Sequence, residues 1–352
     1  MSKVDVLSFG ETMAMLVAEE TGDLALVERF HKRIAGADSN VAIGLARLGF
    51  NVAWLSRVGA DSLGRFVLNT LQAEGLDCQH VAVDPQHPTG FQLKSRVDDG
   101  SDPQVEYFRR GSAASHLNRS ALNPQLLGAR HLHATGIPPA LSASCNELSF
   151  ELMKSMRAAG NSVSFDPNLR PSLWASEQQM IRDINALAAH ADWVLPGLSE
   201  GRLLTGFDDP SDIAAFYLDQ GAEAVIIKLG AEGAFYRTAQ VEQFVPAVPV
   251  ANVIDTVGAG DGFAVGVVSA LLENLGFAQA VQRGNWIGSR AVQSRGDMEG
   301  LPTRAELDHY NALRAPDETT QSACPVTCCE KTKTSSGAPS YAIAKTRRPP
   351  LV

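Results

Sequence analysis

Positive charge is in short supply in this sequence of 352 residues. Its 30 Lys and Arg residues stand against 39 Asp and Glu residues, so the formal net charge is −9. A chain of this kind has no overall field that attracts nucleic acid or an anionic membrane surface, and we expect neither as a partner. Any anionic substrate would have to be held by cations that the fold gathers locally.

Long apolar runs are also missing. No stretch reaches the roughly eighteen apolar residues that a membrane-spanning helix needs, so no span is expected. The first residues contain a single cation, Lys3, and no long apolar core, which is not the pattern of a secretory signal. We therefore expect a cytoplasmic protein.

Cysteines are few and poorly spaced for chemistry. Cys78 and Cys145 are isolated in apolar surroundings and are predicted to be ordinary thiols of the core or its edge. Cys324, Cys328 and Cys329 cluster near the C-terminus. A metal site there is an alternative, but no His or second Cys pair lies at ligand spacing.

Two common nucleotide-binding motifs do not occur. The Gly-rich loop that ends in Gly-Lys-Ser or Gly-Lys-Thr is absent, and no Gly-x-Gly-x-x-Gly follows the first predicted strand. The sequence therefore indicates neither a P-loop kinase nor an NAD-binding enzyme.

Short apolar runs alternate with segments of helical periodicity, which is typical of a parallel sheet covered by helices. Residues 4–10 and 52–58 are predicted strands, while residues 40–49 and the segment that begins at Asp61 are predicted helices. Further strands are expected at residues 131–134, 162–165, 192–195, 224–228 and 234–236.

One region departs from this alternation. Residues 90–97 and 104–109 have the pattern of a hairpin, and the first of them alternates apolar and polar residues like a sheet with one wet face. Together with residues 12–35, the segment 89–115 is expected to form a small sheet beside the main body.

The end of the sequence differs again. A last helix is expected from about Thr303 to Leu313, and the folded domain is predicted to span residues 1–313. Residues 314–352 are rich in Thr, Ser, Pro, Ala and Lys and have no hydrophobic period, so they are predicted to be a disordered tail.

The strongest feature is the run Asp-Thr-Val-Gly-Ala-Gly-Asp-Gly over residues 255–262, which an apolar helix rich in small residues follows. Glycines in such a turn let backbone N–H groups converge, and N–H groups exposed at the start of a helix bind anions. A carboxylate held there, that of Asp261, can take a proton from a hydroxyl that attacks a phosphoryl group. By itself, however, the run fits a Gly-rich turn with a capping Asp equally well.

This run resembles the second signature of the ribokinase (pfkB) family of carbohydrate kinases. The family's first signature is similar to residues 35–42, Ala-Gly-Ala-Asp-Ser-Asn-Val-Ala, and Gly49 and Gly59 follow at the family's spacing. Asp38 departs from it, because many members have Pro or another small residue there. The resemblance extends from Val4 to about Leu313.

The resemblance implies a fold and partners. The expected fold is a three-layer α/β/α sandwich with a mainly parallel sheet and a small discontinuous β-sheet lid. Because lid sheets of the family often pair, a homodimer or higher homo-oligomer is expected. The expected cofactors are ATP and Mg²⁺, with K⁺ as a further candidate.

Roles carried over from the family onto matching positions give a predicted site. Asp261 is the expected catalytic base, and the backbone of Gly258, Ala259 and Gly260 is expected around the transferring phosphoryl group. The expected substrate-binding residues are Gly36, Ala37, Asp38, Asn40, Phe91, Tyr107, Arg109, Arg170 and Asp261. The expected ATP-binding residues are Asn168, Lys228, Gly230, Gly233, Gly258 and Gly260.

The resemblance also points to two cation sites. Glu200 matches the acidic end of the family's Asn-x-x-Glu motif, which arranges Mg²⁺ and water, although Gly197 stands in place of the Asn. We expect Glu200 to hold Mg²⁺ through water. Asp255, together with the backbone of residues 294–297, is similar to the family's site for a monovalent cation.

Residues 107–114, Tyr-Phe-Arg-Arg-Gly-Ser-Ala-Ala, resemble the Tyr-Tyr-Arg-x-Gly-Ser-Ala-Ala run of 2-keto-3-deoxygluconate kinases. An Arg beside aromatic rings can fork onto a carboxylate, and Arg170, at the edge of a predicted strand, offers a second cation. Phosphorylation of that acidic sugar to its 6-phosphate is therefore expected, with Phe91 standing where those kinases often have Tyr. Alternatively, Arg109 and Arg110 are the charges of an exposed hairpin edge, and the enzyme is a fructokinase.

Two interpretations outside the kinases remain open. Residues 197–201, Gly-Leu-Ser-Glu-Gly, match the nucleophile elbow of serine hydrolases, but His309 is the single His that follows. The other interpretation is a protein that senses a sugar or a nucleotide without catalysing a reaction. The presence of Asp261, the candidate catalytic base, argues against it. His131 and His133 share one face of a predicted strand and are expected to be core or rim residues.

Overall fold

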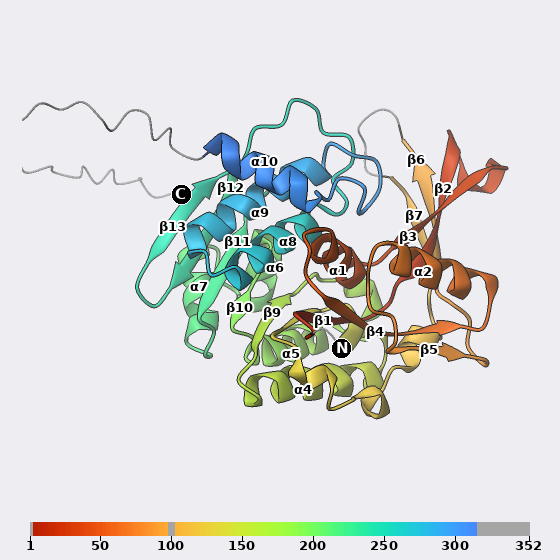
Figure 1. Ribbon diagram of the computed structural model, residues 1–352, viewed down its shortest axis with the longest axis horizontal. Coiled ribbons are helices and arrows are strands. Elements are labelled where there is room, and N and C mark those ends of the chain that lie inside the picture. Colours follow the sequence, from red (N-terminus) through yellow and green to blue (C-terminus); the bar gives the residue numbers. More distant parts are fainter. Residues whose placement is uncertain (1–2, 98–102, 315–352) are drawn as a thin grey trace, which may run out of the picture. The chain divides into compact units, whose positions relative to one another are not determined.

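A large sheet between two layers of helices and a separate small sheet make up the computed structural model, which describes residues 3–97 and 103–314 (Figure 1). Residues up to Tyr310 belong to one compact unit. The predicted tail lies outside the described residues except for Arg314, and with it the three clustered cysteines. None of the helices within the described ranges has the length and apolar character needed to cross a membrane.

Within those ranges the large sheet has nine strands. In spatial order they are β13 (Glu242–Pro246), β12 (Gly233–Thr238), β11 (Ala224–Lys228), β10 (Trp193–Val194), β9 (Ser162–Asp166), β8 (His131–Thr135), β1 (Val6–Phe9), β4 (Val52–Gly59) and β5 (Val81–Asp84). The strands from β11 to β5 are parallel, whereas β12 and β13 pair antiparallel at one edge. The order reverses direction between β1 and β8, and the crevice at such a switch point is where open α/β sheets bind ligands.

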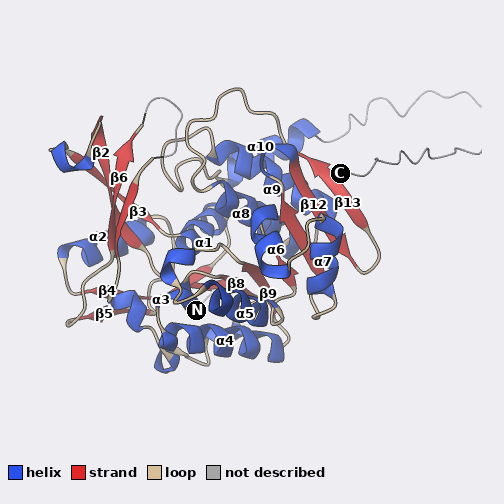
Figure 2. Cartoon of the chain, turned by 180° about the vertical axis from the view of Figure 1, so that it is seen from behind, coloured by secondary structure: helices blue, strands red, loops and turns tan. Residues whose placement is uncertain are grey.

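Helices cover both faces of this sheet (Figures 1 and 2). They are α1 (Ala37–Arg47), α2 (Ser62–Ala73), α3 (Pro138–Leu141), α4 (Ala143–Ala158), α5 (Glu177–Ala188), α6 (Leu198–Thr205), α7 (Pro210–Leu218), α8 (Ala259–Leu272), α9 (Phe277–Ala291) and α10 (Arg304–Arg314). The predicted three-layer α/β/α class is therefore confirmed.

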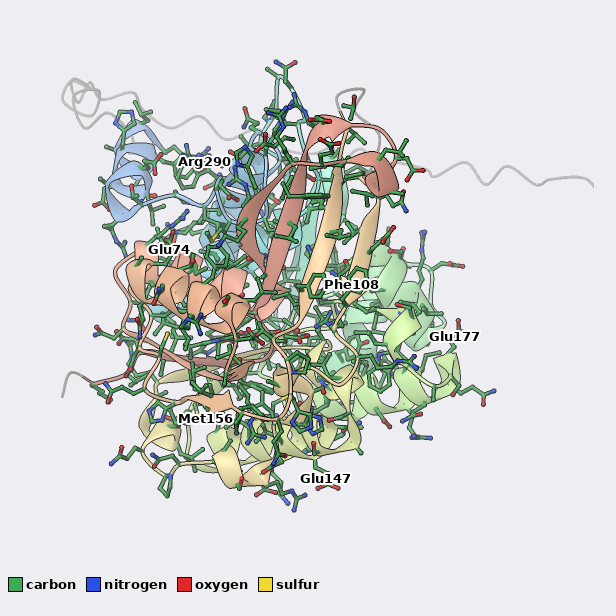
Figure 3. The ribbon with its side chains drawn as sticks, turned by 90° about the vertical axis from the view of Figure 1, so that its right-hand side faces the viewer. Glu74, Phe108, Glu147, Met156, Glu177 and Arg290 are labelled. Carbon is green, nitrogen blue, oxygen red and sulfur yellow. The ribbon has the colours of Figure 1, made fainter. Side chains whose placement is uncertain are left out.

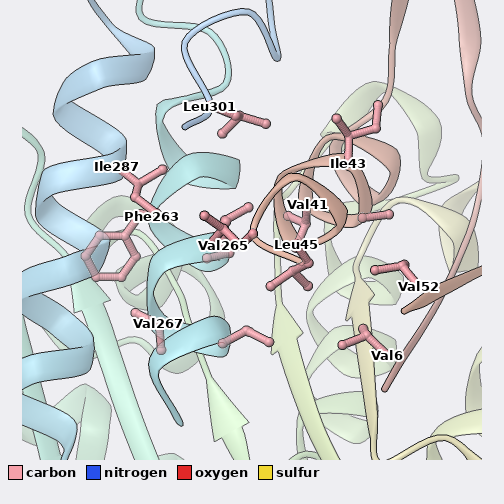
Figure 4. Close-up of a cluster of buried hydrophobic side chains, with 14 of the residues drawn as sticks. Val6, Val41, Ile43, Leu45, Val52, Phe263, Val265, Val267, Ile287 and Leu301 are labelled. Atoms are coloured by element: carbon pink, nitrogen blue, oxygen red, sulfur yellow. The ribbon is translucent and has the colours of Figure 1, made fainter. Parts of the chain in front are cut away.

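Each face has its own apolar core. On one face, side chains of α1, α8 and α9 such as Leu45, Val265 and Ile287 form one buried cluster that also includes Val6 of β1 (Figure 4). On the other, helices α4, α5 and α7 pack over the opposite side chains of the same strands, Phe165 among them. A parallel strand buried on both faces has to be apolar throughout, which explains the continuous apolar runs in the sequence.

The predicted strands and helices are present, with two kinds of difference. Strands β5 and β13 were not predicted, since both lie at sheet edges and are half-exposed, so no apolar run marks them. Helix α1 begins at Ala37, three residues before the predicted start. The N-cap residue is Gly36, which has no side chain to accept a hydrogen bond from the first turn. The sequence therefore lacks the Ser, Thr, Asp or Asn that usually marks the start of a helix.

The second sheet is small and forms within the two segments predicted for it, residues 12–35 and 89–115. Its order is β3 (Phe30–Ala35), β2 (Met13–Thr21), β6 (Phe91–Arg96) and β7 (Val105–Phe108), with β6 and β7 antiparallel as the hairpin pattern predicted. Phe108 lies on the outer strand β7 (Figure 3), where its ring is half-exposed and stacks on Phe91. Residues 98–102, between the two segments of the predicted hairpin, lie outside the described residues.

The two strand histidines are core residues, as predicted. The ring nitrogens of His131 lie 2.8 Å from the hydroxyls of Ser162 and Ser164, and Nδ1 of His133 lies 2.8 Å from Ser164. Burial lowers the pKa of both rings, to about 3 for His133. They are therefore neutral polar links between β8 and β9.

Helices α8 and α9 meet backbone to backbone, and this yields a test of the packing. A Cβ added to Gly266 would lie 2.5 Å from the Cα of Gly284. Gly266→Ala should therefore push the helices apart and lower the free energy of unfolding by about 1–3 kcal/mol, measured by urea denaturation. Gly128→Ala is the matched control, since its Cβ would meet nothing within 4 Å. Equal stability of both variants would contradict the close approach.

Candidate active site

A cavity of about 470 Å³ is lined by the carboxyl ends of the parallel strands on one side and by the small sheet on the other. It gathers most of the predicted site. The predicted residues in its wall are Gly36, Ala37, Asp38, Asn40, Tyr107, Arg109, Asn168, Arg170, Glu200, Lys228, Gly258, Gly260 and Asp261. Segments far apart in the sequence therefore meet around one space.

A second cavity, of about 880 Å³, adjoins the first. The two share Lys228, Thr256 and Gly260 in their walls. Predicted residues Gly230, Gly233 and Ala259 line the second cavity, and its apolar wall includes Val248, Val250, Val253, Phe263 and Val292. An apolar space beside a helix N-terminus suits a nucleotide, which has a flat apolar base and anionic phosphates.

The start of α8 separates the two cavities. Its N-cap, Gly258, has φ +81°, and a Cβ there would lie 2.3 Å from the backbone oxygen of Asp297, so glycine is required. No side chain caps the helix. The N–H of Ala259 lies 3.4 Å from the backbone oxygen of Thr256, whereas the next N–H, that of Gly260, is open to an anion. The positive end of the dipole of this 14-residue helix points the same way.

Asp261 lies in the first turn of α8 and is 8% exposed. Asn40 Nδ2 donates a hydrogen bond of 2.8 Å to its Oδ2, and Asn168 Nδ2 lies 3.5 Å from its Oδ1. Burial raises the pKa of Asp261 to about 7, against the effect of the Asn40 hydrogen bond, which lowers it. A carboxylate whose pKa lies near neutral pH is well matched to accepting a proton.

Lys228, at the end of β11, supplies a cation beside this turn. Its Nζ donates to Oδ2 of Asp166 at 2.6 Å and lies 3.6 Å from the position of a Cβ on Gly260. Burial acts to lower the pKa of Lys228, but the charges of Asp166 and Glu200 outweigh it, so the pKa is raised. The ammonium is therefore charged and held in place, next to open N–H groups.

Asn168 is held in a rare backbone conformation next to the same carboxylate. Its φ of 39° is positive, and its N–H donates to Oδ1 of Asp166 at 3.1 Å. Asn tolerates the left-handed region better than most residues. The loop after β9 thus turns sharply enough to bring the Asn168 amide to Asp261.

Asp38 lines the first cavity and has one buried oxygen without a hydrogen-bond partner among the described residues. Its Oδ2 accepts from the Thr135 hydroxyl at 3.1 Å, while its buried Oδ1 has no hydrogen-bond partner among the described residues. Burial raises the pKa of Asp38 to about 8. At neutral pH this group is mainly the neutral acid, so it adds little negative charge to the wall of the cavity.

Arg109 is not the free cation that the sequence predicted. Its Nε and Nη2 donate to Oε2 of Glu11 at 2.7 and 2.6 Å, and the Ser112 hydroxyl donates to Oε1 of the same Glu. Both Arg109 and Glu11 are buried. The sequence analysis did not predict Glu11, although a charged residue two positions after the end of the buried strand β1 is a signal that could have identified it.

The small sheet presents alternate residues to the cavity. Gln92 and Tyr107 line it, whereas Phe91 does not and instead stacks on Phe108. Successive residues of a strand point to opposite faces of the sheet. On β6, therefore, Gln92 faces the cavity, and the predicted residue, Phe91, faces away from it. Arg170 lines the cavity, is exposed, and has no carboxylate partner among the described residues. It is therefore the freer of the two predicted Arg residues.

Glu200 is fixed at the N-terminus of α6. Its Oε1 accepts from Leu169 N at 2.8 Å and its Oε2 accepts from Gly197 N at 2.7 Å. Each oxygen keeps a second lone pair. The carboxylate is therefore held rigidly while it can still accept hydrogen bonds from water.

Asp255 is already paired with a cation. Lys94, on β6, donates from Nζ to Asp255 Oδ2 at 2.8 Å and to Asp297 Oδ1 at 3.4 Å. Lys94 is 4% exposed. The sequence prediction did not include Lys94, because nothing in its local pattern distinguishes it from a surface lysine.

The elbow pattern at residues 197–201 lacks the geometry of a hydrolase. A nucleophile elbow holds its Ser in a strained turn, but Ser199 lies exposed in α6. The non-Gly residues with positive φ in the described ranges are Asn168 and Asn274. Ser199 is therefore an ordinary helix residue.

Comparison with known families matches residues 3–304 to the pfkB family of carbohydrate kinases. The chain belongs to this family. The match confirms the family resemblance inferred from residues 35–42 and 255–262, and it includes every predicted site residue.

Two relatives in the family illustrate its range. The chain is 52% identical over 310 residues to a 2-dehydro-3-deoxygluconokinase of Bacillus subtilis, covering 88% of this chain and 95% of the relative. It is 31% identical to a fructokinase of Salmonella typhimurium, covering 87% of this chain and 98% of the relative.

Solved structures of related proteins have a similar fold. A PfkB protein from Polaromonas sp. JS666 is 55% identical with a TM-score of 0.81, covering 87% of this chain and 99% of that one. A putative ribokinase II from E. coli, in complex with ATP and Mg²⁺, is 25% identical with a TM-score of 0.80, covering 88% and 99%. A fructokinase double mutant from Vibrio cholerae O395, bound to fructose, ADP and a potassium ion, is 29% identical with a TM-score of 0.76, covering 88% and 98%.

The residues of this chain suit a magnesium–nucleotide complex. No group of three or more His, Cys, Asp or Glu side chains in the described ranges has the geometry to hold a metal by itself. Mg²⁺ is commonly held by one or two carboxylates, several waters and substrate phosphates. The rigid carboxylate of Glu200, with lone pairs left for water, fits that mode beside the open end of α8.

The fit is poor for a monovalent cation at Asp255. The ammonium of Lys94 already contacts Oδ2 of Asp255 and Oδ1 of Asp297. Another cation at these atoms would meet a like charge in a buried setting, which is unfavourable.

Proposed function

We propose that this chain transfers a phosphoryl group from ATP to 2-dehydro-3-deoxygluconate, which is the 2-keto-3-deoxygluconate of the sequence prediction, and forms the 6-phosphate. The observation that carries this proposal is the position of Asp261, buried where the polar cavity and the apolar cavity meet at the start of α8. The 52% identity to the Bacillus subtilis 2-dehydro-3-deoxygluconokinase supports the substrate.

Asp261 acts as the base of this reaction. One of its oxygens takes the proton of the sugar O6 as O6 forms a bond to the γ-phosphorus. The bond from that phosphorus to the bridging oxygen breaks, ADP leaves, and the proton passes to solvent as the product departs. Asn40 holds the carboxylate in line through its 2.8 Å hydrogen bond.

The transferring group is stabilised by fixed charges. The N–H groups of Gly258 and Gly260 and the ammonium of Lys228, 3.6 Å from the position of a Cβ on Gly260, bind the charge that spreads over the phosphoryl oxygens. Mg²⁺, held through water by Glu200, neutralises phosphate charge when it is bound. Gly230 and Gly233 border the space for the base and ribose.

The acidic sugar is held by the first cavity. Arg170 is the exposed cation that meets the substrate carboxylate, and Glu11 orients the buried Arg109 toward the same cavity. The hydroxyl of Tyr107 and the carboxyl group of Asp38, which both line this cavity, bind sugar hydroxyls. The small sheet acts as a lid that excludes water and limits ATP hydrolysis.

The expected homo-oligomer stays a prediction of the family likeness. The half-exposed ring of Phe108, which lies on the face of the small sheet away from the cavity, supports pairing of two such sheets.

Asp261→Asn should lower kcat by about 10²–10⁴-fold, because the amide cannot take the O6 proton. Release of ADP, followed by a coupled assay, measures this, and thermal denaturation checks that the variant folds. Asp219→Asn, at an exposed carboxylate beyond α7, is the matched control with unchanged kcat. A near-normal kcat for Asp261→Asn would refute the assignment of the base.

The pH dependence follows from the same group. A base works when it is deprotonated, and burial raises the pKa of Asp261 to about 7, so kcat/KM for the sugar should rise with pH and level off above about 7. Asn40→Ala removes a hydrogen bond that lowers this pKa, so its midpoint should move to higher pH. A profile that is flat between acid and neutral pH would contradict the proposal.

Arg170→Ala should raise KM for 2-dehydro-3-deoxygluconate about tenfold or more while changing KM for fructose little, because the lost bond is to a carboxylate. Arg109→Ala should show the same selectivity, with added loss of stability, since it leaves Glu11 buried and unpaired. Arg110→Ala, at the exposed neighbour, is the control. Equal effects on both sugars would favour a fructokinase.

A further inference from the structure

Lys94 reaches from the small sheet into the base of the candidate active site. It lies on β6, and its ammonium donates to Asp255 Oδ2 at 2.8 Å and to Asp297 Oδ1 at 3.4 Å. The side chain of Lys94 is 6% exposed, and those of Asp255 and Asp297 are 10% and 8% exposed. A buried lysine between two buried carboxylates is a built arrangement, not a surface ion pair.

The two carboxylates belong to the segments that shape the phosphoryl-binding turn. Asp255 begins the loop before α8, and its Oδ1 accepts from Val257 N at 3.0 Å. Asp297 packs its backbone oxygen against Gly258, at 2.3 Å from where a Cβ would be. Lys94 therefore links both segments whose relative position sets the direction of the first N–H groups of α8.

Charge explains why a cation is needed between them. Two neighbouring buried carboxylates repel each other, and this repulsion would spread the loop of residues 255–258 away from the segment that carries Asp297. An ammonium in contact with both removes the repulsion and adds charge-assisted hydrogen bonds. The related Vibrio cholerae fructokinase was solved with a potassium ion, a monovalent cation like the lysine ammonium.

We propose that Lys94 is a built-in monovalent cation, which replaces an exchangeable K⁺ at Asp255 and Asp297 and positions the anion-binding turn of α8. This inference rests on the proposed phosphoryl transfer at that turn. Lys94 touches neither the sugar O6 nor the phosphoryl group in this scheme, so it is a positioning residue. Lys94 lies on β6 of the small sheet, which is the proposed lid. The lid therefore supplies the cation that holds the anion-binding turn of α8 in position.

The test compares potassium chloride with tetramethylammonium chloride at equal ionic strength. The wild-type enzyme should have the same Tm and the same kcat in both salts, because its cation is covalently attached. Lys94→Met, which keeps the length of the side chain and removes the charge, should have a lower Tm and a kcat about 10–100-fold lower in tetramethylammonium. Potassium should raise both values for this variant.

Two further variants act as controls. Lys94→Arg retains a cation and should show no potassium response, so it tests the idea even if Lys94→Met fails to fold. Lys32→Met removes an exposed lysine of the same small sheet, from β3, and should behave as wild type in both salts.

Two results would overturn the proposal. One is a wild-type Tm and kcat that potassium raises specifically, since this would show an exchangeable site beside Lys94. The other is a Lys94→Met variant that potassium does not rescue. The Tm measurements need no substrate, so absence of turnover on every sugar would refute the proposed function while the potassium response of Tm would still decide the role of Lys94.

Discussion

The first turn of α8 is the constraint on which the rest of this structure depends. The helix has to begin at a glycine, because Gly258 has a left-handed φ and lies against the backbone of Asp297. No side chain caps this helix, and Asp261 lies in its first turn, next to the N–H of Gly260. The apolar packing of α8 on α1 and α9 then fixes the turn relative to Asn40, which lies in α1, and to Lys228 at the end of β11.

The charges around the site follow a common pattern. Each buried cation is held by a carboxylate: Lys228 by Asp166, and Arg109 by Glu11. Such pairing offsets the free energy cost of burying the charge, and it fixes the direction in which the remaining donors point. The pattern also explains how a chain with a net charge of −9 can bind anionic substrates. The positive potential is local, at the end of α8, and Arg170 adds a cation at the cavity edge.

Much of the fold and part of the site could be predicted from local patterns. The buried parallel strands appear as continuous apolar runs, and the loop of residues 255–262 has glycines where the backbone requires them. The edge strands β5 and β13 could not be predicted in this way, since half-exposed strands need no apolar run. The prediction placed Phe91 in the site, but its neighbour Gln92 lines the cavity. A sequence shows that polar and apolar residues alternate along a strand, but it does not show which face of the strand borders the cavity.

The sequence by itself determined the family, the α/β class and the candidate base, because these depend on backbone conformations and apolar periodicities that short segments encode. Only the tertiary structure decided which cations are free. Arg109 is paired with Glu11, 98 positions away, and Lys94 with Asp255, 161 positions away. Contacts between distant segments leave no local pattern, since each partner alone is an ordinary charged residue. The charge that each side chain can offer to a substrate is therefore a property of the folded chain.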